Sequence, residues 1–286
     1  MPSTTPPIDV ATPPNWDSIP DEILCPLCEY NLRGIPEPRC PECGFKFEWD
    51  EVLNPTRRQH RFVFEHQGSR RARAFWKTAV AGLRPGKFWR ELTPVQPSFP
   101  KRLFVYWLIA MAIACVGETG FVALMLYLEQ PFYGRNSVEL FSYAAMMSTP
   151  FWLLTFAWPL LSAASFFVYQ FSMFRAKVRE IHVLRCVLYS SDIAMWAGLA
   201  LPILAVPWIV AIGTIPRDHA EQAIAIQMMC VPLLAWLIFS YRLCRALQLY
   251  LRFSHSIAMV LCGQIMTALT IAILVLYGSE LLRWRF

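Results

Sequence analysis

Four cysteines near the N-terminus carry the clearest chemical signal in the sequence. They form two Cys-x-x-Cys pairs separated by eleven residues, and Gly44 follows the last cysteine. Two such pairs place four thiolates around one tetrahedral ion, and a glycine permits the positive φ that a knuckle turn often needs. The spacing predicts a small β zinc ribbon over residues 25–50 with one structural Zn²⁺ ion. The predicted metal ligands are Cys25, Cys28, Cys40 and Cys43.

The ribbon is expected to be structural. Four cysteine ligands leave no open coordination position for catalysis, and a module of about thirty residues is too small to hold its own hydrophobic core. Iron in a rubredoxin-like site is the alternative metal. Arg33 and Arg39 could touch nucleic acid, but six acids nearly surround them, so we expect no nucleic-acid binding by the ribbon.

The rest of the chain offers little further chemistry. It contains no metalloprotease, serine-hydrolase, P-loop or dinucleotide-binding motif, and its five histidines are scattered. We therefore expect no enzymatic activity, and solvated or headgroup-facing positions for the histidines. Glu118 is the one ionisable residue well inside an apolar run, about 22 Å along a helix from Leu103. It is either a proton, ion or lipid-headgroup site or a protonated or hydrogen-bonded carboxyl packed against a neighbouring span.

The elements around these residues are predicted to be membrane helices. Of the 286 residues 56% are hydrophobic and only 16% charged, which is typical of an integral membrane protein. The sequence contains five apolar runs, and each is long enough to cross a bilayer, which takes about 20 residues. The predicted spans are Leu103–Leu128, Leu140–Phe174, Ile193–Pro216, Gln222–Tyr241 and Ser256–Ser279. Prolines inside the second to fourth spans favour kinks, which either help the helices pack or build a cavity at bilayer depth. The fold class is therefore an all-α polytopic bundle of five spans.

Basic residues predict how the spans are oriented. With five spans, 22 of the 26 Lys and Arg residues fall on the side of the N-terminus. By the positive-inside rule the N-terminus is cytoplasmic and the C-terminus is outside. The knuckle thiols need reducing surroundings to hold a metal, which predicts the same orientation. We expect a multi-pass protein of the cell membrane.

A basic and aromatic segment, residues 51–102, joins the ribbon to the first span. From Arg57 to Arg102 it has a net charge of +10, and a helix after Ser69 would carry apolar side chains on one face. We expect it to lie in the cytoplasmic interface of an anionic leaflet; the alternative is a solvated linker whose aromatics pack on the spans. The expected interface residues are Arg71, Arg73, Trp76, Lys77, Arg84, Lys87, Trp89 and Arg90.

A second amphipathic stretch, Arg175 to Asp192, lies between the second and third spans. It is expected to cap this connection at the cytoplasmic face. Together with the loop Arg242–His255 it would gather basic residues, Arg185 among them, where lipid phosphates could bind.

The chain thus divides into five parts. The first 24 residues contain six prolines and four acids but no basic residue, so they are expected to be a disordered tail. The predicted parts are the tail 1–24, the ribbon 25–50, the juxtamembrane segment 51–102 with its amphipathic helix, the membrane domain 103–278 and a short outside tail 279–286.

The order of features from Ala74 to Tyr277 resembles the Yip family of five-span membrane proteins. The resemblance rests on Phe88-Trp89-Arg90-Glu91-Leu92 before the first span and on Leu188-Tyr189-Ser190-Ser191 before the third. It implies the five-span fold but offers no catalytic residue. The ribbon is similar to N-terminal ribbons on membrane proteins of planctomycete-like bacteria. A bacterial chain would lack the prenylated GTPase partners associated with eukaryotic Yip relatives, so that activity is not carried over.

Two functional hypotheses follow. The first is a non-enzymatic membrane adaptor, in which the bundle anchors the chain, the basic segment binds the inner leaflet and the ribbon recruits a cytoplasmic protein. The second is a lipid or small-solute transporter with a regulatory ribbon. The paraquat-inducible membrane protein A family has a similar layout, which is an argument by analogy. The spans have few polar residues apart from Glu118, and this favours the adaptor.

Overall fold

The computed structural model of this chain describes residues 14–19, 22–54, 59–68, 71–133, 137–168, 178–211, 217–253 and 255–283. Within them the chain is mostly helical, and five helical stretches are long and apolar enough to cross a membrane. This confirms the predicted helical membrane bundle with five candidate spans. Residues 1–13 of the expected N-terminal tail, and 284–286 of the expected C-terminal tail, lie outside the described residues.

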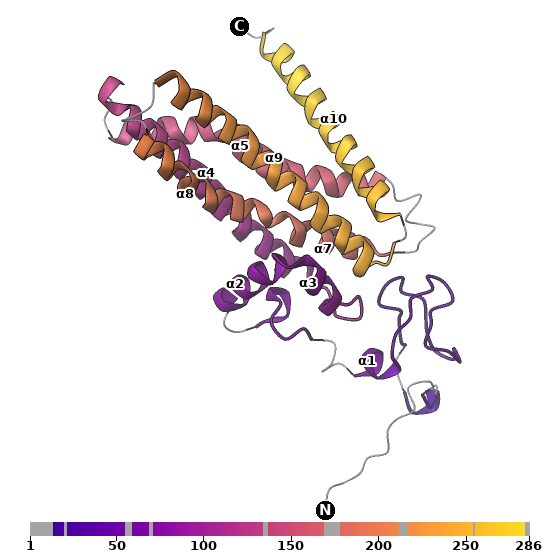
Figure 1. Cartoon of the computed structure of the whole chain (residues 1–286). Helices are drawn as coiled ribbons and strands as arrows, with labels where there is room; N and C mark the ends of the chain where they lie inside the picture. Colours follow the sequence, from indigo (N-terminus) through magenta and orange to yellow (C-terminus); the bar gives the residue numbers. More distant parts are fainter. Residues whose placement is uncertain are drawn as a thin grey trace, which may run out of the picture.

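Long helices form the bundle and contain the five candidate membrane spans. Figure 1 shows α4, α5, α8 and α9 running side by side, with α10 along one edge and ending at the far side from the N-terminus. α7 and α8 together form the third candidate span, Glu180–Leu204. The bounds are α4 Pro100–Tyr133, α5 Ser137–Val168, α7 Glu180–Ser191, α8 Ile193–Ala211, α9 Arg217–Leu249 and α10 Ser256–Arg283.

Two glycines allow α4 and α8 to approach closely. A Cβ at Gly117 would lie 2.3 Å from the carbonyl oxygen of Gly198, and a Cβ at Gly198 would lie 2.7 Å from that of Ala114. Backbone atoms cannot rotate away from such a clash, so only glycine fits here. Small residues at helix contacts are a general means of association between membrane helices. This contact places Glu118, the next residue of α4, beside α8.

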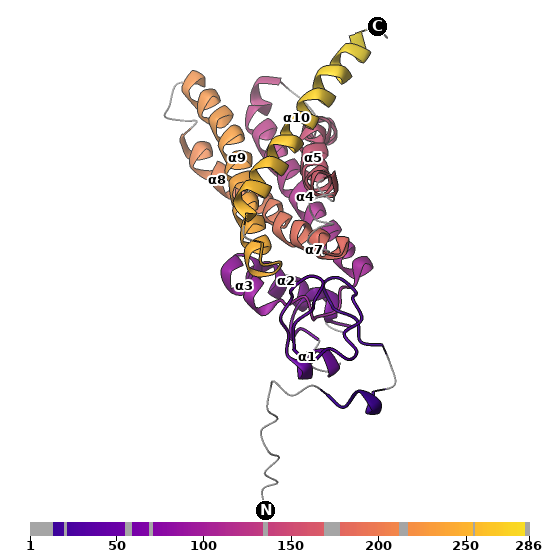
Figure 2. The ribbon, with the colours of Figure 1, turned by 90° about the vertical axis from the view of Figure 1, so that its right-hand side faces the viewer.

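Shorter helices cover one end of the bundle. α2, Arg71–Gly82, and α3, Pro85–Glu91, lie there in both views (Figures 1 and 2). The predicted juxtamembrane helix is therefore present. α3 has proline in its first turn, where the missing N–H costs no hydrogen bond. α10 continues to Arg283, past the predicted end of the fifth span at Ser279.

The segment with the four cysteines, residues 22–47, is called the cysteine module below. It contains no β-strand, although all its residues are described; the backbone forms turns with two isolated antiparallel bridges, Leu24–Asn31 and Arg39–Lys46. The expected β-structure is thus reduced to single bridges. One physical reason is that Pro36 and Pro38, between the knuckles, have no N–H for a strand ladder.

Part of the expected disordered tail is ordered. Trp16–Ser18 forms a 3₁₀ turn, and the ring of Trp16 packs edge-on against Trp49 of α1, Trp49–Leu53, with 5.1 Å between ring centroids. Ile23 is buried as well. The folded part therefore begins before Cys25, because aromatic side chains on both sides of the module pack on each other.

Candidate functional site

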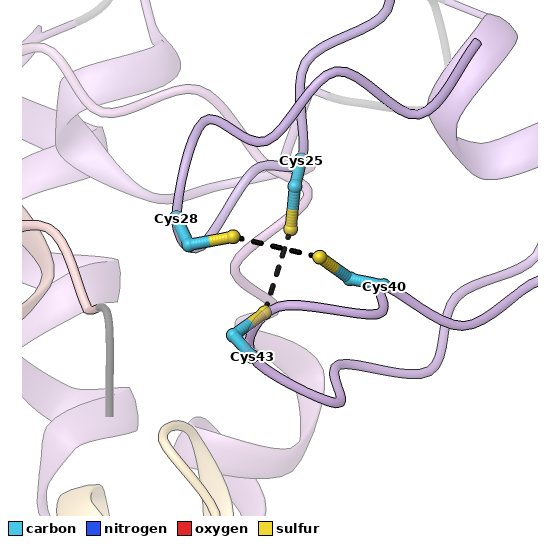
Figure 3. Close-up of side chains that lie close together, drawn as sticks. All are labelled: Cys25, Cys28, Cys40 and Cys43. Carbon is cyan, nitrogen blue, oxygen red and sulfur yellow. Dashed lines mark hydrogen bonds between the residues drawn. The ribbon is translucent and has the colours of Figure 1, made fainter. Parts of the chain in front are cut away.

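The four predicted cysteines come together in space. All four sulfur atoms lie within 4.8 Å of one another, with 3.7 Å between those of Cys25 and Cys43 and 3.5 Å between those of Cys28 and Cys40 (Figure 3). A tetrahedral ion with metal–sulfur bonds of about 2.3 Å places its ligands about 3.8 Å apart. The cluster therefore has the donor set and the dimensions to hold one metal ion.

The two knuckles have the same backbone pattern. The N–H of Glu29 donates to the carbonyl of Cys25, and the N–H of Gly44 donates to that of Cys40, both at 2.9 Å. Both donors take left-handed conformations, with φ of 63° for Glu29 and 70° for Gly44. The positive φ expected for Gly44 is confirmed. Glu29 adopts it despite a side chain, a conformation that costs about 1–2 kcal/mol outside glycine.

The thiols of the cluster have very different proton affinities. A hydrogen bond from the Cys43 thiol lowers the pKa of Cys25 to about 5. Burial raises the pKa of Cys28 to about 12, and the hydrogen bond to Cys25 raises the pKa of Cys43 as well. Thiolates are the metal ligands, so a metal ion that occupies the cluster must displace protons.

The first knuckle is held against the start of α7. The backbone N–H of Arg179 donates to the carbonyl of Leu27 at 3.0 Å, and its guanidinium pairs with the carboxylate of Glu29 at 2.9 Å. His182 donates from Nε2 to the carbonyl of Pro26 at 2.8 Å, and its side chain is buried. These contacts attach the cysteine module to the bundle.

A fully buried ion pair lies behind this contact. Arg185 of α7 pairs with Glu65, with 2.5 Å between Nη2 and Oε1, and neither side chain is exposed. The guanidinium also donates to Tyr250 Oη at 3.0 Å, to the carbonyl of Pro97 at 2.9 Å and to that of Gln96 at 3.2 Å. The expectation that Arg185 faces lipid phosphates is therefore wrong, because protein acceptors take up its donors.

Three histidines also differ from expectation. His60, His66 and His182 are buried rather than solvated. His66 accepts a hydrogen bond on Nδ1 from the N–H of His60 at 2.6 Å and donates from Nε2 to the carbonyl of Pro97 at 2.8 Å. Both ring nitrogens are used in the neutral form, and burial lowers the pKa of His60 and of His66 to about 4.

A second buried ion pair joins three membrane helices. Asp192, between α7 and α8, pairs with Arg242 of α9 at 2.6 Å and accepts a hydrogen bond from Tyr106 of α4 at 2.5 Å. The sequence predicts no role for either acid, Glu65 or Asp192. The signal for Asp192 is its position directly before an apolar run, since a buried acid needs a partner.

The predicted interface residues of α2 and α3 fall into two groups. Trp76 of α2 is exposed, and so are two apolar residues that follow it at helical spacing, Val80 of α2 and Leu83 directly after the helix. The remaining basic residues predicted for the interface are exposed too, namely Arg71, Arg73, Lys77, Arg84, Lys87 and Arg90. A broad groove of about 910 Å³ lies along the two helices, and its lining includes Arg73, Trp76, Lys77, Arg84 and Lys87.

Trp89 does not belong to this surface. Its side chain is only 1% exposed and packs against Tyr250, with 5.6 Å between ring centroids. Phe75 and Ala79 of α2 are buried too, so the predicted single apolar face of this helix is divided between the core and the surface. Helical periodicity places residues on a face but does not say which neighbour covers it.

Glu118 lies in the membrane-spanning part and contacts α5. Its Oε1 accepts a hydrogen bond from the Thr155 hydroxyl at 2.8 Å, while Oε2 is buried and has no hydrogen-bond partner. The residue lines a pocket of about 420 Å³ between α4, α5, α8 and α9. The hydrogen bond matches the expected carboxyl packed against a neighbouring span. The unpaired oxygen is still available to a proton, an ion or a lipid headgroup, which was the other alternative.

No family model matches this chain, and neither a curated protein nor a solved structure is significantly similar to it. The resemblance to the Yip family therefore stays a prediction. Function has to be argued from the cysteine cluster, the exposed face of α2 and the pocket at Glu118.

Proposed function

We propose that this protein is a non-enzymatic integral membrane scaffold whose metal-loaded ribbon presents a fixed docking surface to a cytoplasmic protein. The observation that carries the proposal is the attachment of the first knuckle to α7. The backbone carbonyls of Pro26 and Leu27 are held by His182 and Arg179. A module fixed in this way has one orientation relative to the membrane, as a recruiting platform requires.

Zinc is the proposed metal, and the cysteine module is then a zinc ribbon. Four thiolates at tetrahedral spacing suit Zn²⁺, and a closed set of protein ligands suits a structural ion. Iron would accept the same donors, but the short loop between the knuckles favours zinc. The ion would stabilise a module that has turns and bridges instead of strands.

The exposed side of the ribbon suits a protein partner. Exposed residues of the module carry both charge signs and include one aromatic ring, namely Arg33, Glu37, Arg39, Glu42 and Tyr30. A surface with both charge signs and an aromatic residue suits a protein partner better than a nucleic acid, because the backbone of a nucleic acid is uniformly negative.

The exposed face of α2 supports binding to the inner leaflet. Trp76, Val80 and Leu83 would enter the boundary between headgroups and acyl chains, while the basic side chains around them would contact anionic lipid. Together with the distribution of Lys and Arg, this supports a cell-membrane protein with a cytoplasmic N-terminus and an outside C-terminus. The Yip-like layout is part of the same proposal.

A lipid or small-solute transporter with a regulatory ribbon is the second candidate. The pocket beside Glu118 favours it, because an apolar pocket with one carboxylate at bilayer depth suits a ligand.

Co-purification from native membranes tests the scaffold. Wild-type protein is compared with Cys40→Ser/Cys43→Ser, and bound proteins and lipids are identified by mass spectrometry. The matched control is Cys230→Ser/Cys262→Ser, since these two cysteines are exposed and outside the module. The scaffold predicts a protein partner that is lost only from the knuckle variant. Retention of the same proteins by all three chains, or of a phospholipid or solute alone, would contradict it and favour the transporter.

A further inference from the structure

The pocket at Glu118 opens between α5 and α9. α10 packs against both of these helices and closes one side of the gap. Leu154 of α5 and Leu233 of α9 line the pocket and are 39% and 55% exposed. Because both belong to candidate membrane spans, the opening faces the acyl chains of the bilayer. A ligand would therefore enter sideways from the membrane.

Among the described residues that line it, the pocket offers acceptors but no cation. Glu118 is the only charged residue of this described lining. Carboxylate oxygen Oε2 is buried and unpaired, and leaving a buried acceptor unsatisfied is unfavourable. Pro159 also lines the pocket, and it has no N–H to donate to the carbonyl of Thr155, one turn earlier in α5. A ligand that donates hydrogen bonds would satisfy these groups.

Two tryptophans form a wall of the pocket. Their indole N–H groups are already used, since Trp158 and Trp236 both donate to Gln264 Oε1 of α10 at 2.9 Å. An anionic or purely accepting ligand would therefore find no free indole donor. The aromatic rings remain, and ring faces attract organic cations.

We propose that this pocket binds a lipophilic amine, whose ammonium group donates to Glu118 and whose apolar body lies between α5 and α9. The volume of about 420 Å³ lies in the usual range of small-molecule sites, about 300–1,000 Å³. A phosphate-bearing headgroup does not fit, because none of the described residues that line the pocket is Lys or Arg. The proposal goes beyond the scaffold and is independent of the ribbon.

Photoaffinity labelling of the full chain in phosphatidylcholine nanodiscs tests this site. The probe is a decylamine carrying an aryl trifluoromethyl-diazirine, and the matched probe is the corresponding decanol. We expect saturable labelling by the amine in α5 and α9, competed by unlabelled decylamine. Labelling should fall about tenfold in Glu118→Gln, as loss of a charge-assisted hydrogen bond implies. Glu91→Gln is the control, since this acid lies in α3 outside the candidate spans.

Three results would overturn the proposal. They are equal labelling of wild type and Glu118→Gln, equal labelling by the amine and the alcohol, and labelling that is unsaturable and spread over all spans. If Glu118→Gln does not fold, Leu233→Trp replaces it, because this substitution narrows the opening and leaves Glu118 intact. The expected result is then loss of labelling in a folded variant, and unchanged labelling would equally contradict the site.

Discussion

At the scale of single residues, charged side chains lie in the interior of this protein as well as on its surface. Glu65 and Arg185 are completely buried, and Asp192 and Arg242 nearly so. A buried charge persists only when it is paired and hydrogen-bonded, because its desolvation costs several kcal/mol. Arg185 looks like a headgroup ligand in the sequence because its partner Glu65 lies 120 residues away.

Removal of one member of the buried pair should be strongly destabilising. In Arg185→Met the carboxylate of Glu65 loses its ion pair in the interior, which costs about 3–5 kcal/mol. We expect a clearly lower apparent Tm in detergent, and a partial recovery in the double variant Glu65→Gln/Arg185→Met. Arg179→Met is the control, since its pair with Glu29 is half exposed and worth about 0–1 kcal/mol. Equal losses in Arg179→Met and Arg185→Met would contradict the argument.

The buried histidines should make stability depend on pH. The pKa of His66 falls from 6.5 to about 4 on folding, so between these values the unfolded chain binds a proton that the folded chain does not. Stability must therefore decrease as the pH falls from 6.5 toward 4. We expect the apparent Tm to drop over this window, by about 2–4 °C for each kcal/mol lost.

The variant His66→Gln should show a smaller drop, because the titrating group is gone. His255 is exposed, so His255→Gln should behave as wild type. Thermal unfolding of the three chains at several pH values makes the comparison. A drop of the same size in His66→Gln and wild type would assign the pH dependence to other groups.

At the scale of elements, the sequence predicts the helices better than their surroundings. Apolar runs and caps predicted the five spans and α2 because both signals are local. Local patterns cannot assign the two apolar faces of α2, since Phe75 is covered by residues outside this helix, Phe64 and Tyr106. The same limit applies to Trp89, which the sequence predicts for the membrane interface but which lies in the core.

The contact between α4 and α8 gives a matched pair of glycine substitutions. Gly117→Ala should be strongly destabilising, because the new Cβ would meet the backbone of Gly198 at 2.3 Å. Gly120→Ala, one turn further along α4, should be neutral or slightly stabilising, because nothing lies within 4 Å and alanine favours helices by about 1 kcal/mol. Folded yield and apparent Tm check both. Similar behaviour of the two variants would mean that this contact does not determine the helix packing.

At the scale of the whole molecule, one apolar core joins the cysteine module to the bundle. It runs from Leu32 and Phe47 through Trp89 to Tyr106 and Leu243. The sequence predicts the cysteine cluster and the spans as separate parts, because each has its own spacing rule. It has no signal for their connection, since the hydrogen bond from His182 to Pro26 spans 156 positions.

Because of this connection, we expect metal removal to lower the local stability of the start of α7 as well as that of the module. Without an ion the knuckles lose their crosslink, and the carbonyls of Pro26 and Leu27 no longer have fixed positions for His182 and Arg179. Chelation should therefore speed amide hydrogen exchange in the module and at the start of α7. A loss of ~1.4 kcal/mol in local stability would give about a tenfold increase in exchange.

The control segment is the middle of α10, which has no part in this contact and should exchange at the same rate with and without chelator. His182→Leu should speed exchange at the start of α7 in the presence of metal, because the bonds to Pro26 and Tyr250 are both lost. In that variant chelation should have little further effect on α7, while the module still responds. Chelation that changes the module alone in the wild-type chain would show that the ribbon and the bundle are independent, and would remove the basis for a fixed platform.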